Sequence, residues 1–254
     1  MNFKIEKTEI SKHRNNKMKL FAIGNNAKTI KSDMSGQYLT AIMYLAPADS
    51  VTGINVCPMA KLAGCIAGCL HHAGRAKIFP AIHAARIRKT EFLRDDPIGF
   101  VDQMKSDIRL AQKKAEKLGV KLAVRPNGTS DIAWENIRGS NGLTLMEEFP
   151  DIQFYDYTKL PNRKTPSNYH LTVSYSGANQ AYAEKVQKTK HNIAVVFRDK
   201  NLPAKYLGRK VVNGDQTDLR FLDESGVVVG LYAKGEAKND KSGFVVDSNI
   251  IARG

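Results

Sequence analysis

The most continuous apolar run of the chain, Tyr38–Ala46, limits the folds that are open to it. The run closes at Pro47 and is the pattern of a strand covered on both faces. Short β-rich runs then alternate with helix-length or turn-rich connections, which favours a parallel sheet with covering helices. The strands predicted after the first run are Val120–Arg125, Ile152–Tyr157, Tyr169–Tyr175, Ile193–Phe197 and Val227–Tyr232.

A long helical region is predicted from about Pro80 to Leu118, where apolar side chains recur at roughly helical spacing. Pro97 splits this region in two and Gly119 ends it. Asn179–Lys188 is a further helix-length or turn-rich connection. We therefore predict an α/β fold in one domain, with a parallel βα sheet that forms a partial or complete barrel or an open doubly wound sheet.

The chain divides by composition into an arm and a domain. Residues 1–30 are rich in Lys and Asn, and we expect a basic N-terminal arm or an edge strand there. Residues 31–254 are expected to form the α/β domain, which carries a loop with all the cysteines. Residues 1–16 are polar, and no stretch approaches the ~20 apolar residues that span a bilayer. We expect a cytoplasmic protein, without a membrane partner.

The net charge is the main indication of a partner. Lys and Arg outnumber Asp and Glu by 39 to 25, which gives +14 at pH 7. The excess is spread from Lys4 to Arg209, which favours a basic folded face over a single charged tail. A nucleic acid, DNA or RNA, is the expected partner, and charge that only serves solubility is the alternative.

Three cysteines lie close together and form the most specific feature of the sequence. Cys57 precedes a proline, Cys65 follows after seven residues, and Cys69 after three more, in a loop rich in Gly and Ala. Thiolates are soft metal ligands, and small residues let a loop wrap a compact centre. An odd number of clustered cysteines also fits a reducing compartment better than a disulfide framework.

Three interpretations of this loop remain open. A [4Fe–4S] cluster on three thiolates leaves one iron for an exogenous ligand, as in radical S-adenosylmethionine enzymes, although those enzymes usually show a tighter spacing of three and then two residues. Zinc would take a fourth ligand from His71 or His72. In the third interpretation the cysteines are buried or spectator thiols that pack as small hydrophobes.

Polar residues gather directly after several predicted strands, where parallel α/β folds build their sites. Arg125, Asn127, Ser130 and Asp131 combine a guanidinium, two neutral groups and an acid, a set suited to a ribose, a carboxylate or a phosphate. An Asx-type turn that caps a helix is the alternative for this loop. Ser174 ends another predicted strand and joins the same candidate set.

Two further groups of charged residues are candidates for chemistry. Asp156 and Lys159 lie at the end of the next predicted strand, and Lys159 is either a phosphate ligand or a solvated surface lysine. Gly214–Asp218 with Arg220 and Asp223 concentrates carboxylates, which suits a divalent cation, acid–base chemistry or a plain charged turn. The sequence lacks Walker, dinucleotide, zincin and hydrolase signatures.

Several segments together resemble a gene-product-88-like protein family encoded by bacteriophages and prophages, over residues of about 20 to 247. They are Leu45–Ala48, Asn55–Pro58 with Cys65 and Cys69–Leu70, Ala73–Arg75, Arg125–Asp131, Phe154–Lys159, Gly214–Asp215, Asp218–Asp223 and Val229–Gly235. In the family's cysteine turn the places of His71 and His72 need not be histidine. The resemblance thus implies a three-thiolate cluster more than zinc, and it names no reaction.

These observations lead to one hypothesis and two rivals. The leading hypothesis is a phage-type iron–sulfur enzyme, similar in plan to radical S-adenosylmethionine proteins, that acts on a nucleic acid or nucleotide. Its cluster ligands would be Cys57, Cys65 and Cys69, its catalytic residues Asp131 and Asp156, and its cofactor- or substrate-orienting residues Arg125, Asn127, Ser130 and Ser174. The rivals are a zinc-dependent base-modifying barrel enzyme and a non-enzymatic nucleic-acid-binding phage protein with a structural zinc.

Overall fold

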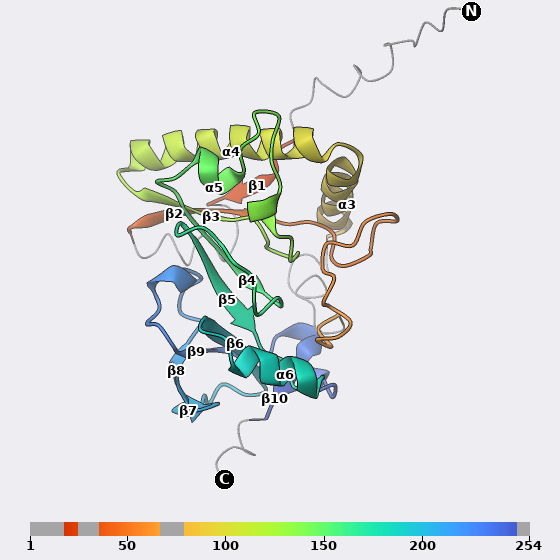
Figure 1. Cartoon of the computed structure of the whole chain (residues 1–254), viewed down its shortest axis with the longest axis vertical. Helices are drawn as coiled ribbons and strands as arrows, with labels where there is room; N and C mark the ends of the chain where they lie inside the picture. The colour runs from red at the N-terminus through yellow and green to blue at the C-terminus, as the bar shows by residue number, and fades with distance from the viewer. Residues whose placement is uncertain (1–17, 25–35, 67–78, 248–254) are drawn as a thin grey trace, which may run out of the picture.

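The described residues form one mixed sheet with helices packed on it (Figure 1). The computed structural model describes residues 18–24, 36–66 and 79–247. Within these ranges the strand order is β1-β2-β3-β4-β5-β6-β9-β8-β7, and β10 pairs with β6. The strands are β1 (Phe21–Ile23), β2 (Tyr38–Met43), β3 (Lys121–Arg125), β4 (Gln153–Thr158), β5 (Tyr169–Ser174), β6 (Asn192–Phe197), β7 (Lys205–Tyr206), β8 (Arg209–Asn213), β9 (Val228–Tyr232) and β10 (Val245–Val246).

The mostly parallel α/β sheet predicted from the sequence is confirmed, but it does not close into a barrel. The neighbouring pairs from β2 to β8 are parallel, whereas β1 and β7 pair antiparallel with β2 and β8. These two short antiparallel strands occupy opposite ends of the strand order and do not pair with each other. The sheet is therefore open, and the expectation of a complete barrel is not met.

The predicted break at Pro97 separates two helices, α3 (Pro80–Asp95) and α4 (Pro97–Leu118). The Asp96 side chain accepts a hydrogen bond from the Gly99 amide at 2.9 Å and caps α4. Gly119 ends α4 in the left-handed conformation, with a φ of 67°, which glycine adopts without a steric penalty. No helix in the described residues has the length and apolar character needed to cross a bilayer.

Helices α4 and α6 (Gln180–Gln187) cover the same face of the sheet. Residues that are partners in register across parallel strands lie on the same face of the sheet. One such row on this face joins Val124 to Phe154, and a second row joins Val173 to Ile193 and Val228. The first row packs in a core cluster with α4, and the second packs with α6. The alternate residues, among them Arg125 and Tyr157, project to the opposite face.

Three segments complete the molecule around this sheet. The turn η3 (Arg220–Leu222) contacts β4 and β5, and Leu219 packs with Tyr155 on the face opposite the helices. The connection between β3 and β4 contains η2 (Trp134–Asn136) and α5 (Leu145–Glu148), whereas β4 joins β5 without a helix. Near the C-terminus, η4 (Gly235–Asn239) leads to β10, which pairs with β6 at Val196 and Phe197, beyond the part of β6 that pairs with β5.

Replacing Phe100 with alanine should destabilise the fold strongly. Phe100 is fully buried on α4 and stacks on Trp134 with ring centroids 6.0 Å apart. Its loss leaves a cavity, and we expect the free energy of unfolding to fall by about 3–5 kcal/mol. Urea unfolding followed by fluorescence of Trp134, the single tryptophan, measures this change. Ile98→Ala on the same helix is the control, since Ile98 is 53% exposed and should cost less than about 1 kcal/mol. Equal costs would contradict this assignment of the core.

Candidate functional site

A cavity of about 340 Å³ lies at the carboxyl ends of the parallel strands. Its wall includes residues from the ends of β3, β4, β5, β6 and β9, from the loop that follows β8, and from the loop that follows β2. Most of the residues selected from the sequence lie in this wall: Cys57, Cys65, Arg125, Asn127, Ser130, Asp131, Lys159, Ser174, Asp215 and Asp218. Residues more than one hundred positions apart are thus brought together, at the edge of the sheet where parallel α/β proteins bind ligands.

The cysteine loop is joined to the strand ends by hydrogen bonds to its backbone. The Asp131 amide donates to the Val56 carbonyl at 2.8 Å, and the Ser176 hydroxyl donates to the Ala63 carbonyl at 2.7 Å. The loop therefore spans from the end of β3 to the end of β5. The Cys57 thiol contacts the Thr129 carbonyl at 3.6 Å, and the Cys65 thiol contacts the Ala60 carbonyl at 3.7 Å.

Two of the three cysteines are present in the described part of the chain, and neither forms a disulfide there. Cys69 lies outside the described residues, as do His71 and His72. Among the residues that are described, no group of three His, Cys, Asp or Glu side chains is placed to hold a metal ion. A metal centre at this loop would therefore need a ligand from outside the described residues, where Cys69 lies.

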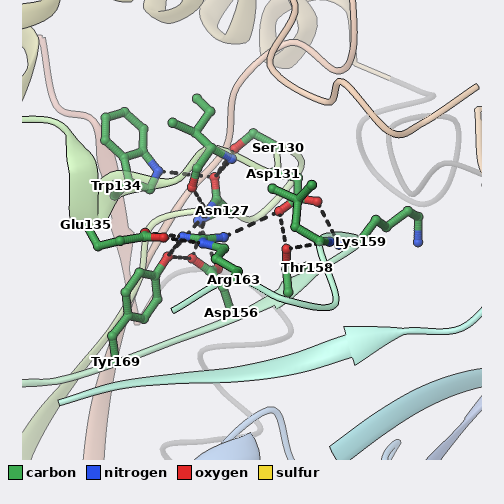
Figure 2. A network of polar contacts seen from close by, with 12 residues as sticks. Asn127, Ser130, Asp131, Trp134, Glu135, Asp156, Thr158, Lys159, Arg163 and Tyr169 are labelled. Atoms are coloured by element: carbon green, nitrogen blue, oxygen red, sulfur yellow. Dashed lines mark hydrogen bonds and ion pairs between the residues drawn. The ribbon is translucent and has the colours of Figure 1, made fainter. Parts of the chain in front are cut away.

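The Asn127 side chain holds the loop that follows β3 in shape (Figure 2). Its Oδ1 atom accepts hydrogen bonds from the Ser130 hydroxyl at 2.7 Å, the Ile132 amide at 3.0 Å and the Trp134 indole at 3.1 Å. Its Nδ2 atom donates to the Ile132 carbonyl and to Asp156, both at 2.9 Å. Asn127 and Ser130 line the cavity, but their polar side-chain groups form hydrogen bonds that fix the conformation of the loop.

Asp156 lies behind the cavity wall and is fully buried. Its carboxylate accepts hydrogen bonds from the Asn127 amide at 3.0 Å and from the Tyr169 hydroxyl at 2.6 Å. Burial raises the pKa of Asp156 to about 7, opposed by the positive charge of Arg125. The geometry gives Asp156 the role of joining β4 and β5 to the loop, and it does not place this carboxylate against a ligand in the cavity.

Asp131 does line the cavity, and its carboxylate is held by groups from β4 and the segment after it. The Thr158 hydroxyl donates to Oδ1 at 2.8 Å, and the Lys159 amide donates to Oδ2 at 2.7 Å. Arg163 lies 3.5 Å from Oδ1 and also pairs with Glu135. Burial raises the pKa of Asp131 against these opposing hydrogen bonds. Asp131 is thus a positioned acid on the cavity wall.

Arg125 forms a buried ion pair with Asp218, and both residues line the cavity. Its Nη1 atom lies 2.9 Å from Asp218 Oδ2, and its guanidinium lies 4.8 Å from the ring centroid of Tyr157. The other carboxylates of the predicted acidic turn are also paired, Asp215 with Lys234 and Asp223 with Arg220. These ion pairs favour the interpretation of this segment as a charged turn whose carboxylates are neutralised by Arg and Lys side chains.

The comparison with protein families matches nearly the whole chain. A family model for gene product 88 matches residues 14–248, which include the cysteine loop and all ten strands of the described sheet. The chain belongs to the gene product 88 family. This confirms the resemblance to a phage-type family. No curated protein and no solved structure matches the chain.

Sequence reasoning missed two residues that hold the candidate site, Arg163 and Glu135. Arg163 donates to the Tyr169 hydroxyl at 3.0 Å and to both oxygens of Glu135 at 2.7 and 2.6 Å. Arg163 lies in the helix-free connection between β4 and β5, and Glu135 lies in η2. No motif marks either residue, because their pairing depends on how two irregular connections fold over the sheet.

The buried Asp156 carboxyl should make the protein less stable as the pH rises from about 4 to about 7. The pKa of this carboxyl rises from the ordinary 3.8 of an aspartic acid to about 7 in the fold, so between these pH values the folded state keeps a proton that the unfolded state has released. The free energy of unfolding therefore decreases as pH rises through this window. The Asp156→Asn side chain has no such proton to exchange. Relative to the wild type, the variant's free energy of unfolding should therefore rise by roughly 2–3 kcal/mol from pH 4.5 to pH 7.5.

Urea titrations at both pH values test this dependence. The matched control is Asp151→Asn, because Asp151 is exposed on the surface and its replacement should leave the pH dependence of the wild type intact. An Asp156→Asn variant with the wild-type pH dependence would show that the buried carboxyl stays ionised throughout.

Proposed function

We propose that the cavity at the carboxyl edge is the active site of a phage-type iron–sulfur enzyme, similar in plan to radical S-adenosylmethionine proteins, that acts on nucleic acid or nucleotides. The observation that carries the proposal is that Cys57 and Cys65 line the same cavity as Arg125, Asp131 and Ser174. A centre bound by the cysteine loop would thus face the polar groups at the strand ends. Enzymes on parallel α/β sheets place their reacting groups at this edge.

The donor set fits a thiolate-bound centre. Cys57 and Cys65 are only partly buried, and their thiols make weak contacts with the carbonyls of Thr129 and Ala60. Exchanging these weak contacts for metal bonds would therefore cost little in native interactions. Cys69 follows Cys65 after three residues and supplies the third thiolate in this proposal. A [4Fe–4S] cluster on three thiolates supplies an iron with an open position and one-electron chemistry.

The cavity residues then have distinct roles. Asp131, held by Thr158 and the Lys159 amide, is the group that holds or moves a proton at the wall. The Ser174 hydroxyl makes no hydrogen bond within the described residues and is available to orient S-adenosylmethionine or substrate. Arg125, held by its ion pair with Asp218, lines the wall as a residue that orients cofactor or substrate, while Asn127 and Asp156 keep the loop in place.

Protein prepared without oxygen should be brown. We expect broad absorbance near ~400 nm and about four irons per chain, since three clustered thiolates suit an open cubane cluster. Metal analysis and a visible spectrum of the same sample measure both. Colourless protein with one tightly bound zinc would replace this proposal with that of a zinc-dependent base-modifying enzyme or a zinc-stabilised nucleic-acid-binding protein.

Replacing the ligands one at a time should identify the donor set. Cys57→Ala, Cys65→Ala and Cys69→Ala should each remove most of the iron, because a cubane cluster held by two thiolates is poorly retained. His71→Ala and His72→Ala are the matched controls in the same loop and should keep the wild-type metal content. Loss of metal in either histidine variant would move the site to zinc.

A further inference from the structure

Lysine ammonium groups lie over two aromatic rings at the cavity. Lys159 Nζ is 5.2 Å from the ring centroid of Phe244, which precedes β10. Lys200 Nζ and Lys238 Nζ lie 5.7 and 5.3 Å from the ring centroid of Tyr232, the last residue of β9. Both rings are partly exposed and line the cavity. Segments that follow β4, β6 and β9 thus bring three cations to two aromatic rings.

These lysines differ from the other cations around the cavity. Arg125, Arg163 and Lys234 each form an ion pair with a carboxylate. Lys159, Lys200 and Lys238 form none with any carboxylate of the described residues. An ammonium group without a carboxylate partner keeps its charge available for an anion.

The backbone on which these groups stand is well held. The Lys159 amide donates to Asp131, and its side chain extends away from the polar network around Asn127 (Figure 2). The Tyr232 amide donates to Asp215 Oδ2 at 2.8 Å. The backbone of Lys159 and Tyr232 is thus fixed while both residues stay partly exposed, which suits the capture of a flexible ligand.

We propose that Tyr232 and Phe244 stack successive bases of a single-stranded nucleic acid at the cavity, and that Lys159, Lys200 and Lys238 bind its phosphates. Aromatic faces beside cations are the parts from which single-strand sites are built. A base that stacks on either ring displaces an ammonium group, which is then free to reach the adjacent phosphate. Duplex is disfavoured because its bases are stacked on one another and hide their faces. The inference rests on the proposed function, because it names the substrate of the same cavity.

Fluorescence anisotropy with the full-length protein tests the inference. The probes are a labelled 12-nucleotide oligo(dT), the matching oligo(rU), a 12-base-pair duplex and AMP as competitor, at 50 and 200 mM salt. We expect the single strands to bind more tightly than the duplex or AMP. Tyr232→Ala and Phe244→Ala should each weaken single-strand binding about tenfold. Tyr232→Phe, which keeps the ring, should bind as wild type, whereas Tyr232→Leu should bind as the alanine variant.

The lysines have a separate signature in the salt dependence. Replacing Lys159, Lys200 and Lys238 together by alanine should reduce the slope of log affinity against log salt by about 2, since each lost phosphate contact removes roughly 0.7. The same replacement of Lys113, Lys114 and Lys117, exposed on α4, is the control and should leave the slope unchanged. The inference is overturned if Tyr232→Leu and Phe244→Ala both bind single strands as the wild type does. It is also overturned if the two triple variants have the same slope of log affinity against log salt.

Two further outcomes separate this inference from the proposed function. AMP binding as tight as that of the oligonucleotides would make the ligand a free nucleotide and reject the strand. Metal content measured on the same samples reports on the cysteine loop alone: Cys57→Ala should lose the metal and still bind oligonucleotide, whereas Tyr232→Ala should do the reverse. Protein that binds the single strands as expected but holds no iron would retain the stacking site and reject the iron–sulfur enzyme.

Discussion

The hydrogen bonds between Asn127 and Asp156 hold the candidate site together. They join the loop after β3 to the middle of β4, and the Tyr169 hydroxyl extends the link to β5. A buried carboxylate is costly unless its oxygens are paired, and here the partners are a backbone amide, a side-chain amide and a phenol. The same loop carries Ser130 and Asp131 into the cavity wall. If these bonds were broken, the wall would lose its shape even though no cavity-lining acid had been removed.

The sheet could be predicted from the sequence because its information is local. The apolar runs at Tyr38–Ala46 and Ile193–Phe197 match β2 and β6 within a few residues, and Pro97 and Gly119 mark the ends of α4. An apolar run of this kind predicts a buried strand from the local sequence alone. The short hairpin of β7 and β8, and the two-residue β10, were missed because they carry no such pattern. They are strands only because β9 and β6 offer them free edges.

The sequence predicted where candidate residues gather but not which of them line the cavity. The rule that parallel sheets build sites at their carboxyl strand ends selected Arg125, Asp131 and Ser174, and the structure places all three on one cavity wall. The rule could not distinguish Asp131, which lines the cavity, from Asp156, which faces the opposite way from its neighbour Tyr157 and lies behind the wall. Whether an aspartate lines the cavity depends on the face of the sheet to which its side chain points and on the hydrogen-bond donors that it meets there. The partners of Asp156 come from residues 127 and 169, which are brought together only by the pairing of the strands.

The placement of β10 has a consequence for how the protein is made. Val245 and Val246 pair with the end of β6 beside the point where β5 leaves it, and the preceding Phe244 forms part of the cavity wall. During synthesis the strands from β1 to β9 emerge first and are able to pair before this last segment is available. The cavity cannot acquire its complete wall until residues 244–246 have left the ribosome. A nascent chain therefore presents an incomplete cavity, whose wall is finished only once this strand has docked on β6.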